Sequence, residues 1–260
     1  MSRKEEEGRP RGGRPSSQGD PAPPGGGPWA PLDRALAAYL EGSGDAVVLM
    51  RTDAGGEEEV PVALFFRRPE EMGPVEATAL AEARGRVFDL GAGPGAHAVP
   101  LSRRGLLVTA AEVLPRARDA LVAGGVGDVR AGGLETLRAG ERFDTILVLM
   151  NGAGLAGSLD GLQGFLVRLA GHLAEGGRLL LDSTDPRAWE DPGDGRYPGE
   201  VHMQLGFEGE WGEPFPFLFV DAGSLRGVAA SVGLDATVVA EEDGGRYLAR
   251  VTPGRPAPAP

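Results

Sequence analysis

Residues 87–96 read VFDLGAGPGA, and this stretch decides the fold. Its first four residues are typical of a buried strand and its glycines of a tight turn, and a helical pattern follows up to Gly105. Gly91 and Gly93 permit positive φ angles and carry no Cβ atom, so a ligand can approach the backbone closely. A strand, a glycine turn and a helix in this order are typical of doubly wound sheets, which bind ligands over their strand ends.

The same alternation continues along the chain and predicts an α/β fold. Apolar strands that alternate with amphipathic helices indicate a doubly wound, mostly parallel sheet covered on both faces. A helix capped by Asp221 and a final hairpin follow. Acidic Glu57–Glu59 is interpreted as a solvated turn. The expected strands are 46–50, 86–90, 106–111, 127–131, 143–150, 178–182, 201–207, 236–241 and 246–251, and the expected helices include one near 32–40 and others at 75–83, 115–122 and from Ser158 through Leu173.

Glycine and proline are unevenly spread and suggest the domain limits. The chain has 260 residues, with 43 Gly and 22 Pro. Residues 1–31 and 253–260 are rich in both and lack apolar periodicity, so we expect disordered tails there. Residues 32–252 hold nearly all the aliphatic side chains and are long enough to bury a core as one domain.

Composition and charge exclude several kinds of site and partner. There is no Cys, and the three His residues are far apart, so we expect no metal site. The formal net charge of −12 argues against a nucleic-acid partner. No apolar run approaches the roughly 18 residues that span a bilayer, and the N-terminus lacks the apolar core of a signal peptide. We therefore expect a cytoplasmic protein with no membrane partner.

Two acidic residues at strand ends indicate the kind of ligand. Asp89 lies within its strand, and a carboxylate buried there needs a cation or a hydrogen-bond donor. A ligand amino group would supply one, whereas a pyrophosphate would be repelled; the alternative is that Asp89 caps local backbone amides. Glu112 closes the next strand, where a carboxylate can accept hydrogen bonds from both hydroxyls of a ribose. NAD and S-adenosylmethionine (SAM) both contain such a ribose.

Four segments resemble successive motifs of class I SAM-dependent methyltransferases. They are VFDLGAGPGAHA (87–98), VTAAEVLPRA (108–117), FDTILVLMNGAG (143–154) and LAEGGRLLLDSTD (173–185), in the family's order and spacing. The resemblance covers about residues 75–251 and implies a seven-stranded Rossmann-like sheet with a reversed last strand. With FFRRPEEM (65–72) and EPFPFLFVD (213–221), the chain is most similar to bacterial members without an assigned substrate.

The resemblance also implies a cofactor and its contacts. SAM would be the cofactor, and the acid that the family often places near adenine after the third strand is absent here. The implied contacts are Asp89, Gly91, Ala92 and Gly93 for the methionine part, Glu112 for the ribose, Val113, Gly132 and Leu134 for adenine, and Met150, Asn151 and Gly152 for the sulfonium region.

The substrate side is expected in residues 183–220, which contain seven of the 15 aromatic residues. We expect an inserted hairpin that covers the substrate; the alternative is that its aromatic side chains only pack it onto the sheet. Methyl transfer needs a base only if the nucleophile arrives protonated. The unranked candidates for such a base are Asp185, Tyr197, Glu200 and His202.

The predicted function is in-line methyl transfer from SAM to a small molecule. The family's Asn/Asp-Pro-Pro-aromatic signature of amide or base nitrogen methylation is replaced here by Asn151-Gly152-Ala153-Gly154, which weakens a nucleic-acid substrate. Two alternatives stay open. The glycine turn also fits GxGxx(G/A), which a NAD(P)-dependent oxidoreductase shows, and a SAM-binding protein without catalytic activity carries the same motifs.

Overall fold

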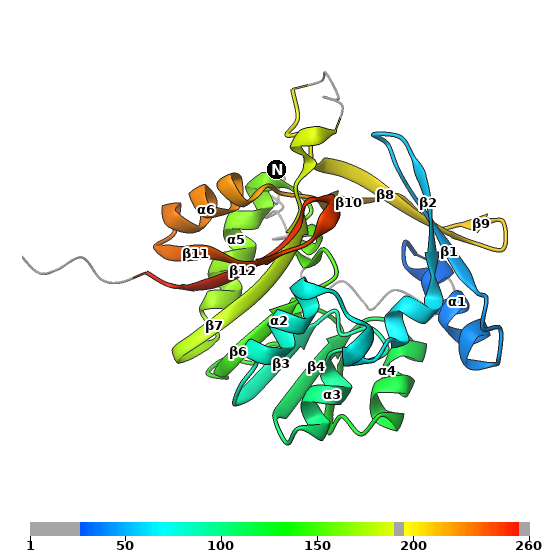
Figure 1. Cartoon of the computed structure of the whole chain (residues 1–260), viewed down its shortest axis with the longest axis horizontal. Helices are drawn as coiled ribbons and strands as arrows, with labels where there is room; N and C mark the ends of the chain where they lie inside the picture. The colour runs from blue at the N-terminus through cyan, green and yellow to red at the C-terminus, as the bar shows by residue number, and fades with distance from the viewer. Residues whose placement is uncertain (1–26, 190–194, 255–260) are drawn as a thin grey trace, which may run out of the picture.

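The larger of two sheets contains seven strands (Figure 1). The computed structural model describes residues 27–189 and 195–254. The strand order is β11-β12-β7-β6-β3-β4-β5, and only β12 runs against its neighbours. The strands are β3 (Arg86–Leu90), β4 (Leu107–Glu112), β5 (Asp128–Ala131), β6 (Phe143–Val148), β7 (Leu173–Thr184), β11 (Leu234–Glu241) and β12 (Arg246–Pro253). The predicted doubly wound sheet with a reversed last strand is confirmed.

Helices cover both faces of this sheet, as its apolar strands require (Figure 1). Phe88 on β3 belongs to the core beneath α5 (Leu159–Ala170) and α6 (Ala222–Ser231). The adjacent Val87 belongs to the core beneath α2 (Pro74–Glu82), α3 (Ala98–Arg103) and α4 (Pro115–Ala123). Successive side chains of a strand point to opposite faces, so one short apolar strand supports both layers.

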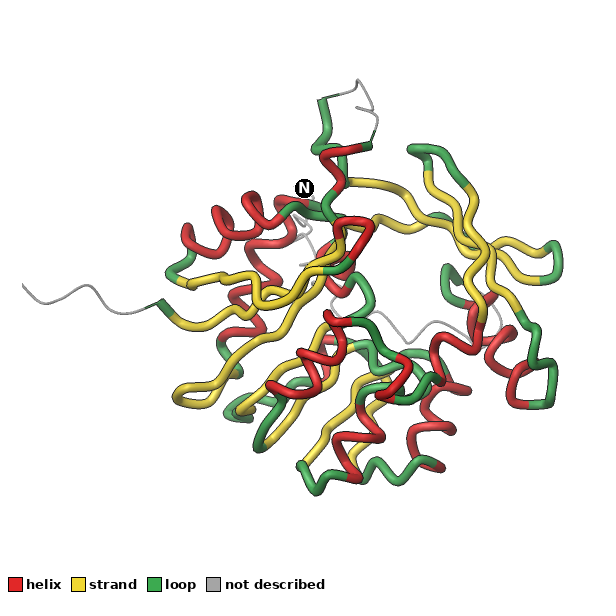
Figure 2. The backbone as a smooth tube through the Cα atoms, viewed as in Figure 1, coloured by secondary structure: helices red, strands yellow, loops and turns green. Residues whose placement is uncertain are grey.

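A second, antiparallel sheet joins segments that are far apart in the chain (Figure 2). Its order is β10-β8-β1-β2, with β9 paired to β8. Val201, Met203, Leu205 and Phe207 alternate along β8 and pack with α1 in a third core. The elements are α1 (Ala30–Leu40), β1 (Val47–Thr52), β2 (Glu57–Pro61), β8 (Glu200–Phe207), β9 (Glu210–Trp211) and β10 (Phe215–Leu218).

The structure differs from four of the predicted assignments. Glu57–Glu59 is part of β2 rather than a turn, because pairing with β1 satisfies its backbone while its side chains stay exposed. Leu173 begins β7 instead of ending α5, which stops at Ala170. The first tail is too long as predicted: α1 begins at Ala30, with Trp29 packed on Phe215 at 4.5 Å between ring centroids. Similarly, β12 extends to Pro253.

The remaining predicted disorder, at 1–26 and 255–260, lies outside the described residues. Within the described part of the chain, no helix combines the length and apolar character needed to cross a membrane.

Candidate functional site

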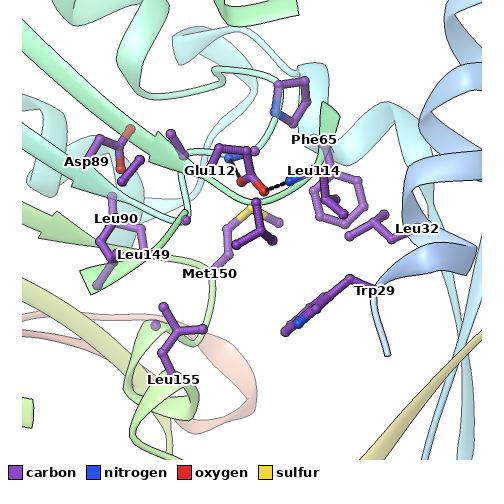
Figure 3. A pocket seen from close by; sticks show the side chains of 18 of the residues that line it. Trp29, Leu32, Phe65, Asp89, Leu90, Glu112, Leu114, Leu149, Met150 and Leu155 are labelled. Atoms are coloured by element: carbon purple, nitrogen blue, oxygen red, sulfur yellow. Dashed lines mark hydrogen bonds between the residues drawn. The ribbon is translucent and has the colours of Figure 1, made fainter. Parts of the chain in front are cut away.

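A pocket opens at the carboxyl ends of β3, β4 and β6, and residues of α1 and β10 also line it. Figure 3 shows this pocket from close by. In Figure 3, Asp89 and Leu90 lie on one side, Glu112 and Met150 in the middle, and Trp29 on the other side. This is the position that the doubly wound topology favours for a ligand. The lining residues are Trp29, Leu32, Leu36, Phe65, Asp89–Gly93, Pro94, Ala96, His97, Ala111–Leu114, Gly132, Gly133, Leu149–Gly152, Leu155 and Phe217.

The glycine turn is tied to the end of β4 by Glu112. Gly91 and Gly93 have φ angles of 70° and 55°, which a residue with a Cβ atom rarely adopts. The Gly93 amide donates to Glu112 Oε2 at 2.7 Å, and the Leu114 amide donates to Glu112 Oε1 at 2.8 Å. Burial raises the pKa of Glu112, while these amide hydrogen bonds lower it in part. Each oxygen keeps a further lone pair for a ligand hydroxyl.

Asp89 is a buried carboxylate that lacks a hydrogen-bond partner at one of its oxygens. Its exposed fraction is 1%, and its Oδ2 is buried without a hydrogen-bond partner. Burial raises the pKa of Asp89 to about 6; His97 opposes this rise, and the nearby charge of Glu112 adds to it. The alternative that Asp89 caps backbone amides leaves this oxygen unexplained. A ligand ammonium group at this oxygen would remove the desolvation cost.

The segment after β6 has an unusual backbone. Met150 and Asn151 have positive φ angles of 64° and 59°, and two such residues in succession are strained. The Gly152 amide donates to Asp182 Oδ1 at 2.9 Å, which holds the following turn. A Cβ atom on Gly154 would lie 2.0 Å from the ring of Phe217, so this glycine lets β10 pack directly on the turn. The second sheet therefore contacts the site through Phe217.

A buried ion network lies behind the glycine turn. Glu76 on α2 accepts hydrogen bonds from His97 Nε2 at 2.7 Å and from Arg67. Arg246 on β12 donates from Nη1 to the same carboxylate at 3.3 Å. Burial would raise the pKa of Glu76, but the hydrogen bonds from His97 and Arg67 outweigh it and bring the pKa to about 2. Glu76 is therefore an ionised group in the interior.

Arg246 extends this network to the turn after β6. Its Nε donates to Asp182 Oδ2 at 2.7 Å, and its Nη1 donates to Glu242 Oε1 at 3.0 Å. Asp182 in turn holds the Gly152 amide. The Arg246 guanidinium thus connects α2, β7 and the loop before β12. Through Asp182, it is also linked to Gly152, which lines the pocket.

The structure brings ten of the eleven implied cofactor contacts together. The exception is Leu134, which does not line the pocket and packs instead against the core beneath α5 and α6. Val113 is 49% exposed within the open pocket. The ten that line it are Asp89, Gly91, Ala92, Gly93, Glu112, Val113, Gly132, Met150, Asn151 and Gly152.

None of the four candidate bases lines this pocket. The Tyr197 hydroxyl donates to Asp221 Oδ2 at 2.8 Å, and burial raises the pKa of Tyr197 to about 12. Glu200 Oε1 accepts from the Leu159 amide at 2.7 Å. Asp185 pairs with Arg187 at 2.6 Å, and His202 Nδ1 lies 3.2 Å from Asp53. Each of these side chains thus has a partner elsewhere.

Sequence reasoning missed the apolar side chains on the far wall of the pocket. Trp29 and Phe65 precede the cofactor motifs, and Phe217 follows the last implied cofactor contact, Gly152, by more than 60 positions. One signal was present: Trp29 is the single large aromatic residue in a Pro- and Gly-rich stretch and stands directly before a helical pattern. His97, the residue that precedes α3, also lines the pocket.

Comparison with known proteins identifies the family. No protein-family model and no curated protein matches the chain. A SAM-dependent methyltransferase from Bacteroides fragilis, solved with S-adenosyl-L-homocysteine, is 33% identical with a TM-score of 0.77, over 86% of this chain and 94% of that one.

Two more distant structures share the fold. The sugar N-methyltransferase KedS8 from Streptoalloteichus sp. is 17% identical with a TM-score of 0.53, over 93% and 98% of the two chains. The CcbJ methyltransferase from Streptomyces caelestis is also 17% identical with a TM-score of 0.55, over 72% and 92%. With a seven-stranded sheet that has one reversed strand, and one third identity across nearly the full length of a relative, this chain belongs to the class I SAM-dependent methyltransferases.

Proposed function

We propose that this protein binds SAM in the pocket and transfers its methyl group to a small, largely apolar molecule. The observation that carries the proposal is the buried, unpaired Asp89 Oδ2 across the glycine turn from Glu112. Asp89 would hold the cofactor's amino group, and Glu112 would hold its ribose hydroxyls. The relative from Bacteroides fragilis, solved with S-adenosyl-L-homocysteine, supports this cofactor.

The chain's own residues would bind and orient the reactants. Bound SAM supplies an electrophilic methyl group, and in-line transfer depends mainly on alignment and exclusion of water. Met150 and Asn151, whose backbone is strained, line the part of the pocket where we place the methyl group that is transferred. Trp29, on the far wall, would cover the reactants and exclude water.

The acceptor class follows from the wall outside the cofactor motifs. Its side chains are apolar without exception: Trp29, Leu32, Leu36, Phe65, Leu155 and Phe217. The ionisable residues that line the described pocket are Asp89, His97 and Glu112, and all lie in the cofactor motifs. We therefore propose an acceptor with an apolar body whose reacting atom carries a free lone pair at neutral pH, as a weakly basic nitrogen or a thiolate does.

Calorimetric titration of the full chain with SAM, S-adenosylhomocysteine and NADPH tests the cofactor. We expect binding of the first two and none of NADPH, because a pyrophosphate would meet Asp89 and Glu112. Release of S-adenosylhomocysteine with aryl thiols and anilines, compared with sugars and aliphatic acids, tests the acceptor class. Binding of NADPH without SAM would contradict the whole proposal, and turnover of only the polar acceptors would contradict the acceptor class.

Glu112→Ala is expected to weaken SAM binding by about 1–3 kcal/mol, because charged hydrogen bonds to the ribose are lost. Glu112→Gln should lose less, since its amide oxygen still accepts from one of the two backbone amides. Calorimetry provides the measurement, and exposed Glu175→Ala is the matched control with unchanged affinity. Unchanged affinity in Glu112→Ala would remove this residue from the site.

A further inference from the structure

The cofactor's methionine part carries a carboxylate as well as an amino group, and the glycine turn offers that carboxylate little. The amides of Gly91 and Ala92 donate to the Ala111 carbonyl at 2.9 and 3.2 Å. The Gly93 amide is held by Glu112, and the Gly95 amide donates to the Ala92 carbonyl at 3.2 Å. Pro94 has no N–H group. Every backbone donor of residues 91–95 is therefore already used.

Among the side chains that line the described pocket, one can supply a positive charge to pair with the cofactor's carboxylate. Among the described residues that line it there is no Lys or Arg, and His97 alone can become a cation. Its side chain is 5% exposed, and its Nε2 lies 2.7 Å from Glu76 Oε1. Because Glu76 is an ionised carboxylate and accepts hydrogen bonds only, Nε2 must donate to it. The second ring nitrogen, Nδ1, makes no hydrogen bond with the described part of the chain.

The ring of His97 lies among acidic groups. Glu76 on α2 contacts the ring, and Asp89 on β3 is close enough for His97 to lower its pKa. Arg67 and Arg246 also contact Glu76, so this carboxylate is shared and held in place. A cofactor carboxylate at Nδ1 would accept the second ring N–H group, so that each ring nitrogen would donate to one carboxylate.

From this arrangement we infer that His97, positioned by Glu76, donates from Nδ1 to the methionine carboxylate of SAM. Asp89 and His97 then form a pair of opposite charges that matches the zwitterion, the carboxylate for the ammonium and the imidazolium for the carboxylate. The inference rests on the proposed function, because it assigns a contact to the proposed cofactor. It makes His97, the residue that precedes α3, a determinant of cofactor specificity.

The test compares SAM with decarboxylated SAM, which lacks only the carboxylate, in wild type and His97→Gln. A Gln side chain places its amide nitrogen near the position of Nε2, so the bond to Glu76 is retained while the Nδ1 donor and the charge are lost. We expect wild type to bind SAM about 10- to 100-fold more tightly than the decarboxylated form, as a charge-assisted hydrogen bond implies. In His97→Gln this ratio should collapse toward one through weaker SAM binding.

A second variant and a stability measurement separate contact from folding. His97→Asn places an amide near the position of Nδ1 but cannot reach Glu76, so we expect it to retain part of the preference for SAM. Thermal unfolding of the free variants should show His97→Gln close to wild type. If His97 only supports Glu76, His97→Gln will keep the full ratio, and that result would overturn the inference. Failure of the wild-type protein to bind SAM at all would instead overturn the proposed function.

Discussion

Replacing Asp89 by Asn is expected to weaken SAM binding by about 100-fold while making the free protein more stable. The loss of affinity arises because the ligand ammonium would face a neutral amide in a buried site, and truncating a buried charge pair costs about 2–5 kcal/mol. The gain in stability arises because the free protein no longer has to bury an unpaired carboxylate, whose Oδ2 has no partner. Calorimetry with SAM and urea unfolding of the free protein measure the two effects.

The pH dependence of this difference follows from the pKa of Asp89. Burial raises that pKa from 3.8 to about 6 in the folded protein, so the folded state binds the proton more tightly than the unfolded state. As the pH rises from about 4 to about 6, the unfolding free energy of wild type therefore falls by about 3 kcal/mol because of this group. The Asn variant lacks this contribution. Its stability advantage should be small at pH 4.5 and largest above pH 6.

Exposed Asp160→Asn is the matched control for Asp89→Asn. It makes the same chemical change on the protein surface. It should alter neither the affinity for SAM nor the pH dependence of the unfolding free energy. An Asp89→Asn variant that binds SAM as tightly as wild type would show that the ammonium group lies elsewhere. A variant that is less stable than wild type at pH 7.5 would show that Asp89 has a partner in solution.

Replacing Arg246 by Met is expected to lower the unfolding free energy by about 3–5 kcal/mol, because it leaves buried carboxylates without their partner. Asp182 is fully buried and Glu76 is 1% exposed, and Arg246 contacts both. Glu242 also loses its ion pair. Met fills much of the space of the aliphatic part of Arg, so the effect measures the charge. Urea unfolding monitored by circular dichroism provides the measurement.

The same strand supplies the control for this prediction. Arg250 lies four positions further along β12 and pairs with Glu82, but its side chain is 38% exposed. Because solvent screens an exposed ion pair, Arg250→Met should cost about 1 kcal/mol or less. Equal losses in the two variants would show that burial of the network does not control its contribution. Since Asp182 also holds the Gly152 amide, only Arg246→Met is expected to weaken SAM binding as well.

Much of the fold and part of the pocket could be predicted from local patterns. The strand that carries Asp89, the glycine turn and the strand that ends at Glu112 are contiguous segments, and their periodicity and glycines determine their conformation. The contact between Gly93 and Glu112 spans only 19 positions and joins the turn after β3 to the end of the adjacent parallel strand β4. Such contacts follow once the order of the strands is known.

The second sheet could not be predicted, because its pairing is long-range. The alternation of Val201 through Phe207 predicts a strand with one buried face, but periodicity does not say which strand it joins. Its partner is β1, about 150 positions earlier, and α1 packs beneath it. Local signals therefore place Trp29 in a tail, whereas the tertiary structure makes it part of the pocket wall.

The sequence by itself determined the alternating strands and helices of the sheet, because neighbouring residues define strand ends and glycine turns. The family resemblance implied the reversed strand and the eleven proposed cofactor contacts, ten of which line one pocket. Two features depend on the tertiary structure alone: the apolar wall of the pocket and the ion pairs of Glu76. Glu76 contacts Arg246, which lies 170 positions away in the chain. A buried charge needs a partner of opposite charge, but any Arg in the chain could be that partner. Which Arg it is can be seen only in the folded chain.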